Sequence, residues 1–324
     1  MRKLFALILA LCLLALSGCR VSPYVIRVGE ERIDAAEAAF YLHADRALAE
    51  SAGEDLQDET VRSGIYRSAL DQIVSASVIR QRCAGLGLTL SEEAAQSIRE
   101  NKQSLQKQLG GTAAYLSWLQ ENYMTDRLYD KLQEGNYYYE VLQNYVSAQL
   151  EQDPRADELL RQFFAENYTR VRYIRISRLD EYGGLLPEEE QAKRLEQAKE
   201  LLVQIWDGAE FEVMMEYWND DPQMAEGPIA VSRAQAETTD YLAGLFELEL
   251  QQPAGVYLAA DGYYILERLP LAANYYDENL DTIFHDALDA RFVQYLEQGR
   301  EELGVHITSD YLKLELDDLL QYVH

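Results

Sequence analysis

The sequence predicts a multidomain α+β protein in which a mostly helical lobe, built from both ends of the chain, carries an inserted α+β domain. Three observations predict this fold class. No proline occurs from Tyr24 through Asp153, and apolar residues recur there at three- and four-residue steps, as in packed helices. Alternating, strand-like patterns appear between residues 171 and 268. After Pro270 the helical period returns.

The first residues have the pattern of a secretion signal. Arg2 and Lys3 precede an apolar run over residues 4–16, which has the length of a signal-peptide core rather than of a membrane span. The tetrapeptide LSGC follows and resembles the lipobox of bacterial lipoproteins, whose cysteine becomes acylated. We therefore expect residues 1–18 to be a signal peptide and Cys19 to carry lipid. The remaining chain would then be extracytoplasmic and anchored to the bacterial cell membrane.

Composition argues against several classes of function. The chain has 56 acidic and 29 basic residues, so we expect it to repel phosphate backbones and to have no nucleic-acid partner. Cys12 leaves with the signal and Cys19 is acylated, which leaves Cys83 as a small buried hydrophobe without a disulfide partner. The four histidines show no metal-ligand spacing. We expect neither a metal nor a cofactor.

The amino-terminal part is predicted to begin with a hairpin and to continue as helices. Gly29-Glu30 is typical of the turn between two short strands within residues 24–33. Asp34 is a plausible helix cap ahead of an apolar face that begins at Ala35. Further helices are predicted over Thr60–Gly85, from Ser91, over Thr112–Tyr145 and over Ala156–Asn167.

The middle of the chain changes its period. Val171–Ser177 alternates as a half-buried strand does, and Asp261-Gly262 is a strong hairpin signal between the strands Gly255–Ala259 and Tyr263–Arg268. Helices are predicted between these strands over Glu188–Asp207, Phe211–Tyr217 and around Tyr241–Leu248. The order β-α-α-α-β-β fits one compact α+β domain.

The carboxyl-terminal part returns to helix. One long helix is predicted over Asn279–Leu303, and a second, short helix near Ser309–Tyr322.

Five short motifs form an ordered series along the chain: the lipobox, VGEERI over residues 28–33, GLGLTLSEE over 85–93, the segment 211–222 and the gap-free run 241–266. This series resembles the SurA/PrsA-type foldases, in which a helical chaperone lobe surrounds a parvulin-type peptidyl-prolyl isomerase domain. The resemblance covers nearly all of the chain after the signal. The lipobox makes the membrane-tethered PrsA branch the nearer relative.

The resemblance implies a domain for each part of the chain. Residues 19–165 would be a helical, SurA N-terminal-like chaperone domain, and residues 168–270 a parvulin-like isomerase domain. Residues 271–324 would be carboxyl-terminal helices that pack on the amino-terminal lobe. The implied partners are unfolded or extended secreted polypeptides, and a homodimer is left open.

The resemblance also implies a site for prolyl isomerisation, at substituted positions. Both family histidines are replaced, because Arg175 stands at the first-strand position and Tyr264 at the last-strand position. The acidic loop position is kept, as Asp220 or Asp221. These four residues are therefore the expected catalytic set.

Three further side chains are expected to bind substrate: Tyr241, Phe246 and Leu248 would form an apolar slot for the proline ring. An isomerase of this kind needs such a slot, an amide freed from water and donors that favour the twisted bond. Glu237 replaces the pocket methionine of the family, and a buried carboxylate there would weaken the slot. The site is therefore expected to be a degenerate one.

Three functions are left open by the sequence. The first is a foldase with isomerase activity, and the second a non-catalytic holdase or assembly factor on the same scaffold. For both, the 23 tyrosines, with a run at 137–139 and a Tyr123-Met124 pair, offer amphipathic side chains for promiscuous contact with polypeptides. The third, a solute-binding lipoprotein of a transporter, should show repeated βαβ units, and the pattern does not predict them.

Overall fold

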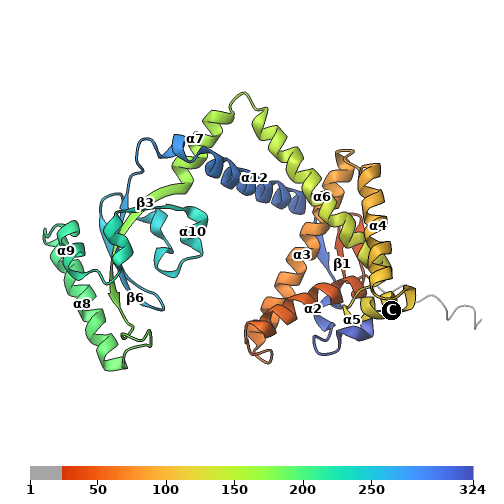
Figure 1. Cartoon of the computed structure of the whole chain (residues 1–324), viewed down its shortest axis with the longest axis horizontal. Coiled ribbons are helices and arrows are strands. Elements are labelled where there is room, and N and C mark those ends of the chain that lie inside the picture. Colours follow the sequence, from red (N-terminus) through yellow and green to blue (C-terminus); the bar gives the residue numbers. More distant parts are fainter. Residues whose placement is uncertain (1–23, 324) are drawn as a thin grey trace, which may run out of the picture. The chain divides into compact units, whose positions relative to one another are not determined.

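The computed structural model describes residues 24–323 (Figure 1). The signal segment and Cys19 therefore lie outside the described residues. The described residues divide into two compact units: one runs up to Gln152 and resumes at Leu288, and the other is Asp153–Ala287. Helices predominate and the two sheets are small, which confirms the predicted fold class.

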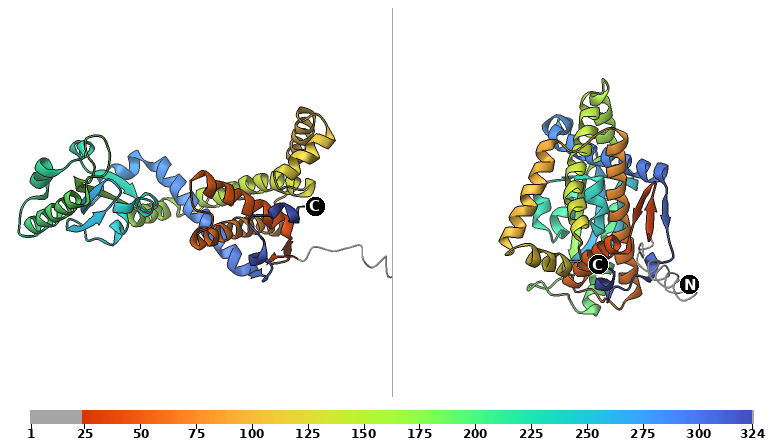
Figure 2. Two further views of the ribbon diagram at one scale, coloured as in Figure 1. Left: turned by 90° about the horizontal axis from the view of Figure 1, so that it is seen from below. Right: turned by 90° about the vertical axis from the view of Figure 1, so that its right-hand side faces the viewer.

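The first unit is helical with one small antiparallel sheet, and we call it the helical unit. Its helices are α2 (Ala35–Ser51), α3 (Glu59–Gly85), α4 (Glu92–Gln108), α5 (Thr112–Glu121), α6 (Asp126–Glu151) and the later part of α12 (Leu280–Leu303). Its strands are β1 (Ile26–Val28), β2 (Glu31–Ile33) and β7 (Val305–Ile307), in the order β2-β1-β7. The sheet thus joins the two ends of the described chain, as the right-hand view of Figure 2 shows.

Local signals of the sequence account for the start of this unit. Gly29 lies in the β1–β2 turn with φ +54°, and an added Cβ would stand 2.6 Å from Oε1 of Gln81, so the turn requires glycine. Asp34 caps α2, because its Oδ1 accepts the backbone N–H of Glu37 at 2.9 Å. The predicted hairpin and this predicted cap are both confirmed.

The core of the helical unit takes residues from both ends of the chain. Buried Ile26, Leu42 and Ile73 share one cluster with Tyr311 and with Leu314, Leu316 and Leu319. The short helix predicted near Ser309–Tyr322 is instead two 3₁₀ turns, η4 (Tyr311–Lys313) and η5 (Leu319–Tyr322). The buried positions 311, 314, 316 and 319 do not fall on one helical face, so a single helix could not bury them all.

A partly buried ion network links the small sheet to the helices around it. Glu31 of β2 pairs with Nη2 of Arg80 at 2.7 Å and with Nζ of Lys131 at 2.7 Å. Lys131 also pairs with Glu37 at 2.6 Å, and Ser77 donates to Glu31 at 2.5 Å. Burial alone would raise the pKa of Glu31, but the charges of Arg80 and Lys131 hold it below its ordinary value.

The second unit is built on a four-stranded antiparallel sheet in the order β4-β3-β6-β5, and we call it the α+β unit. Its strands are β3 (Tyr168–Ser177), β4 (Ile229–Ser232), β5 (Pro253–Leu258) and β6 (Gly262–Leu269). Its helices are α7 (Ala156–Asn167), α8 (Glu188–Trp206), α9 (Phe211–Trp218), α10 (Arg233–Glu237), α11 (Tyr275–Glu278) and the start of α12. Three 3₁₀ turns complete it: η1 (Pro222–Glu226), η2 (Asp240–Leu242) and η3 (Leu245–Glu247).

The predicted strands Val171–Ser177 and Tyr263–Arg268 lie side by side, as parts of β3 and β6. β3 and β6 pair along their length, from Arg170 opposite Leu269 to Ser177 opposite Gly262 (Figure 1). One face of this pair, with Ile174 and Ile265, packs against α8 and α9. The other face bears Tyr173 and carries the candidate site.

Two features of the α+β unit differ from the sequence prediction. Strand β4 was not predicted, because four residues are too few to show alternation and the strand is defined by its pairing with β3. The helix predicted around Tyr241–Leu248 is the pair of turns η2 and η3. Gly244 lies between them with φ +83°, a left-handed conformation that interrupts a right-handed helix.

Candidate functional site

Three tyrosines meet on the free face of the β3–β6 pair, and we call them the tyrosine cluster. They are Tyr173 of β3, Tyr264 of β6 and Tyr241 of η2. The rings of Tyr241 and Tyr264 stack with centroids 3.8 Å apart and planes at 9°. Tyr173 meets both rings edge-on, at 5.4 and 5.2 Å. The rings of Tyr241 and Tyr173 therefore pack directly against the ring of Tyr264.

Carboxylates bind two of the three phenols. Tyr173 donates its hydroxyl hydrogen bond to Oδ2 of Asp221 at 2.8 Å. Tyr264 donates to Oδ2 of Asp261 at 3.0 Å, and Arg175 donates to the same oxygen from Nη1 at 2.8 Å. Asp261 was identified from the sequence only as a hairpin residue, because its partners on β3 and β6 become neighbours only in the folded sheet.

The loop that carries the acidic pair is fixed to strand β3. Ser177 donates its backbone N–H to Oδ2 of Asp220 at 2.8 Å, and Nη2 of Arg175 donates to the carbonyl of Asp220 at 2.8 Å. The backbone N–H of Arg175 also donates to Oδ1 of Asn219 at 2.8 Å. Arg175 and Tyr264 are directly opposed in the sheet register. The fold thus places Arg175, Tyr264 and both acidic residues on or beside one part of the sheet.

Phe246 and Leu248, two of the predicted slot residues, pack against the same core, and both contact arginine side chains. The Phe246 ring lies beneath two guanidinium groups, with Arg233 at 4.4 Å and Arg268 at 5.3 Å from its centroid. Nη1 of Arg268 donates to the carbonyls of Phe246 and Leu248 at 2.8 and 3.0 Å. Glu237, the residue at the pocket-methionine position, is exposed at the end of α10, so its carboxylate is solvated.

Burial raises the pKa of all three phenols in the tyrosine cluster. For Tyr173 and Tyr264 the neighbouring carboxylates of Asp221 and Asp261 raise the pKa further, because they repel a phenolate. Burial also raises the pKa of Tyr241. The cluster therefore presents neutral hydroxyls at physiological pH, two of which already donate to carboxylates.

The tyrosine cluster is expected to make the α+β unit sensitive to alkali. The folded state favours the neutral phenols, whereas an unfolded tyrosine ionises near about pH 10. The cluster therefore contributes its full stabilisation of the fold below about pH 10. This stabilisation is lost as the pH rises through the higher pKa that the phenols have in the folded state. Phenolate absorbance followed during an alkaline titration should show a delayed, cooperative step.

Two variants test this assignment. Tyr173→Phe should reduce the delayed step, whereas Tyr182→Phe, at an exposed loop position, should leave it unchanged. Because other buried tyrosines, among them Tyr311, also have a raised pKa, the comparison with the wild type is decisive: an equal delayed step in Tyr173→Phe would contradict the assignment to the cluster.

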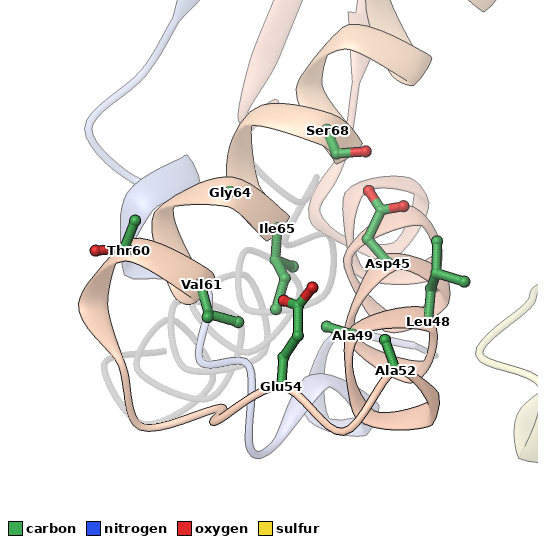
Figure 3. Close-up of a pocket in the computed structure, with 10 residues that line it drawn as sticks. All are labelled: Asp45, Leu48, Ala49, Ala52, Glu54, Thr60, Val61, Gly64, Ile65 and Ser68. Carbon is green, nitrogen blue, oxygen red and sulfur yellow. The ribbon is translucent and has the colours of Figure 1, made fainter. Parts of the chain in front are cut away.

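A second candidate lies in the helical unit, between the end of α2 and the start of α3 (Figure 3). It is an open groove of about 480 Å³. Its walls are Leu48 and Ala49 of α2 and Val61 and Ile65 of α3, and Leu48 is 67% exposed. Such a groove can bury an apolar side chain of another polypeptide.

The tyrosines singled out in the sequence do not form this groove. Tyr123 stacks on His43 with centroids 3.7 Å apart, and Tyr139 meets Phe292 edge-on at 5.2 Å. Both therefore pack within the helical unit. The groove was not predicted from the sequence. Its apolar residues recur at three- and four-residue spacing on α2 and α3, as core residues do, and only the packing of the two helices shows which of them line a groove.

The comparison with protein families gives a match in the amino-terminal part of the chain, which contributes to the helical unit. Residues 3–143, somewhat less than half of the chain, match the family model described as the SurA-like N-terminal domain. No match was found among curated proteins.

Solved structures with partial similarity include three foldases or chaperones. The peptidylprolyl isomerase PrsA of Bacillus anthracis is 14% identical, covering 74% of this chain and 99% of that chain, with a TM-score of 0.35. The foldase protein PrsA of Streptococcus pneumoniae is 18% identical, with coverages of 78% and 89% and a TM-score of 0.29. A structure from Campylobacter jejuni is 11% identical, with coverages of 88% and 99% and a TM-score of 0.32. Its description names PEB4 and Cj1289 as two structurally related SurA-like chaperones. These TM-scores describe a partial likeness, so the assignment depends on the family match.

The fold is thus that of a two-unit chain. The helical unit is built from the two flanking segments of the described chain, and the α+β unit, with its antiparallel sheet, is built from the segment between them in sequence. Residues 3–143 match the SurA-like N-terminal domain, which confirms the predicted resemblance for that part of the chain. No helix among residues 24–323 is long and apolar enough to cross a membrane. The same residues contain no group of three or more His, Cys, Asp or Glu that could hold a metal ion.

Proposed function

We propose that this chain is an extracytoplasmic chaperone that binds unfolded or extended secreted polypeptides, tethered to the cell membrane by lipid on Cys19. Residues 19–165 and 271–324 would form the chaperone part, and residues 168–270 a parvulin-like domain with a degenerate site. The observation that carries the proposal is the open apolar groove between α2 and α3, in the unit that contains the SurA-like domain.

The physical properties of the groove suit transient binding of clients. Unfolded chains expose apolar side chains, and burying one Leu, Ile or Phe contributes about 1.5–3 kcal/mol. A contribution of this size holds a segment without trapping it. The formal net charge of −27 favours solubility of a complex between the chaperone and an unfolded client.

Aggregation of a chemically denatured client, followed by light scattering, tests the proposal. The full chain should suppress aggregation, and Leu48→Gln should weaken suppression severalfold because it removes an apolar wall from the groove. Leu48 is exposed, so the substitution should leave the fold intact.

The matched control is Leu312→Gln, at an equally exposed leucine outside the groove, and it should suppress aggregation like the wild type. Absence of suppression by the wild-type chain would contradict the proposal.

Prolyl isomerisation is a second candidate function. It is favoured by one observation: Arg175, Tyr264 and the Asp220–Asp221 loop lie at one part of the sheet, where the family resemblance puts a catalytic site. The hydrogen bonds of Arg175 and Tyr264 to Asp261 oppose it, because these two donors are already engaged and would have to be released to favour a twisted amide. We therefore expect little or no acceleration of isomerisation.

Exchange spectroscopy of an X–Pro peptide by NMR distinguishes the two functions. A rate equal to the uncatalysed one, with aggregation suppressed, supports the holdase. Acceleration by the wild type that is lost in both Tyr241→Ala and Asp221→Ala would instead establish the isomerase.

A further inference from the structure

The groove between α2 and α3 is apolar on its walls and acidic at its mouth. Glu54 lies in the loop that joins the two helices, and its side chain points from this loop into the space between them (Figure 3). Within residues 24–323 no hydrogen bond or ion pair joins the carboxylate of Glu54. This carboxylate is therefore free to pair with a ligand.

The loop around Glu54 is rich in negative charge. Residues 50–60 contain five carboxylates and neither Lys nor Arg. Asp55 and Asp58 accept the backbone N–H groups of Gln57 and Thr60, at 2.9 and 2.6 Å. These five carboxylates form an acidic rim beside the groove, and Glu54 is the one that also lines it.

The nearest arginines in sequence form no ion pair with the carboxylates of this rim. Nη1 of Arg46 donates to the carbonyl of Leu316 at 2.8 Å. Nη1 of Arg62 donates to the carbonyl of Leu56 in the loop at 3.3 Å and lies 3.6 Å from Asp317, so its ion pair is with the carboxyl-terminal segment of the same unit. At the other end of the groove, the carboxylate of Asp45 is buried and accepts from Nε2 of Gln72 at 2.8 Å. Glu54 is consequently the groove carboxylate best placed to receive a cation.

We propose that this groove binds client segments in which an apolar side chain adjoins a lysine or arginine. The apolar side chain and the aliphatic stem of the basic residue would pack on Leu48, Val61 and Ile65, and the charged end would pair with Glu54. This inference rests on the proposed chaperone function and deepens it, because it names the class of segment that the groove selects. Charge complementarity with the acidic rim also speeds encounter with cationic segments.

Gly64 offers a way to close the groove without disturbing the fold. It lies in α3 and lines the groove, and an added Cβ would meet no atom within 4 Å. A leucine at this position would project into open space, and glycine in a helix interior is itself unfavourable. Gly64→Leu should therefore fold as the wild type does, with its groove filled.

The test measures binding of two labelled peptides to the full chain by fluorescence anisotropy at low salt. The peptides share one apolar core, flanked in one by lysines and in the other by glutamates. The cationic peptide should bind at least about tenfold more tightly, with a difference that shrinks as salt rises. Gly64→Leu should weaken binding of the cationic peptide by about tenfold or more. Glu54→Gln should leave the groove open but reduce the preference between the peptides severalfold.

The matched control is Gly135→Leu, which makes the same substitution inside α6 at a position where an added Cβ also meets nothing. It should bind both peptides like the wild type. Equal affinities of the wild type for the two peptides, or undiminished binding by Gly64→Leu, would overturn the inference. So would sedimentation data in which Gly64→Leu dissociates a dimer, because the groove would then hold a second copy of the chain.

Failure of this inference is distinguishable from failure of the proposed function. A chain that suppresses client aggregation but binds both peptides equally remains a chaperone without the cationic preference. A chain that binds neither peptide and suppresses no aggregation is not a chaperone of this kind.

Discussion

Replacing Tyr311 with alanine is expected to lower the free energy of unfolding of the helical unit by about 3–5 kcal/mol. Tyr311 is 1% exposed, and its hydroxyl donates to the carbonyl of Tyr66 at 2.7 Å. The Tyr66 ring meets it edge-on at 5.8 Å, and the Tyr66 hydroxyl donates to the carbonyl of Leu314. The substitution would leave a cavity and remove a buried hydrogen bond in the core that joins the two ends of the described chain.

Urea denaturation followed by circular dichroism measures this effect. The control is Leu312→Ala, because Leu312 is the next residue but is 68% exposed, and its loss should cost less than about 0.5 kcal/mol. If Tyr311→Ala unfolded at the same urea concentration as Leu312→Ala, the carboxyl-terminal segment would not be part of the core.

Removing the arginine of the partly buried ion network should have the second largest effect. In Arg80→Met, Glu31 and Glu37 would keep only Lys131 as an ion-pair partner. Breaking a fully buried pair costs about 3–5 kcal/mol, and for this partly buried network we expect about 2–3 kcal/mol. The control is Lys313→Met, because its pair with Asp310 is exposed and should contribute little.

The pH dependence of stability distinguishes a charge effect from a packing effect. The folded state holds the pKa of Glu31 below its ordinary value, so the network stabilises the fold above the ordinary pKa. That stability is lost as the pH falls through the lower, folded-state pKa. The stability difference between the wild type and Arg80→Met should therefore shrink on acidification. A difference that stayed constant with pH would assign the effect to packing of the arginine stem.

Local signals made much of the fold predictable. The hairpin at Gly29, the cap at Asp34 and the alternation of Val171–Ser177 each depend on a few adjacent residues, and each is present in the structure. Strands β4 and β7 were not predictable in this way. Each is only three or four residues long and is a strand because a distant partner pairs with it.

The candidate sites were predictable only in part. The motif resemblance assigned positions to Arg175 and Tyr264, and the sheet register sets these residues opposite each other. The ring of Tyr241 over Tyr264 depends on the path of the loop around Gly244, which no local pattern specifies. The free carboxylate of Glu54 likewise became visible only once the loop was seen to direct it between two helices.

Hydrogen exchange of the full chain, with and without an unfolded client polypeptide, tests the central claim most directly. If the helical unit holds clients in the groove, amides within residues 45–68 should exchange more slowly when the client is present. Protection confined to residues 168–270, or no protection anywhere, would contradict the account.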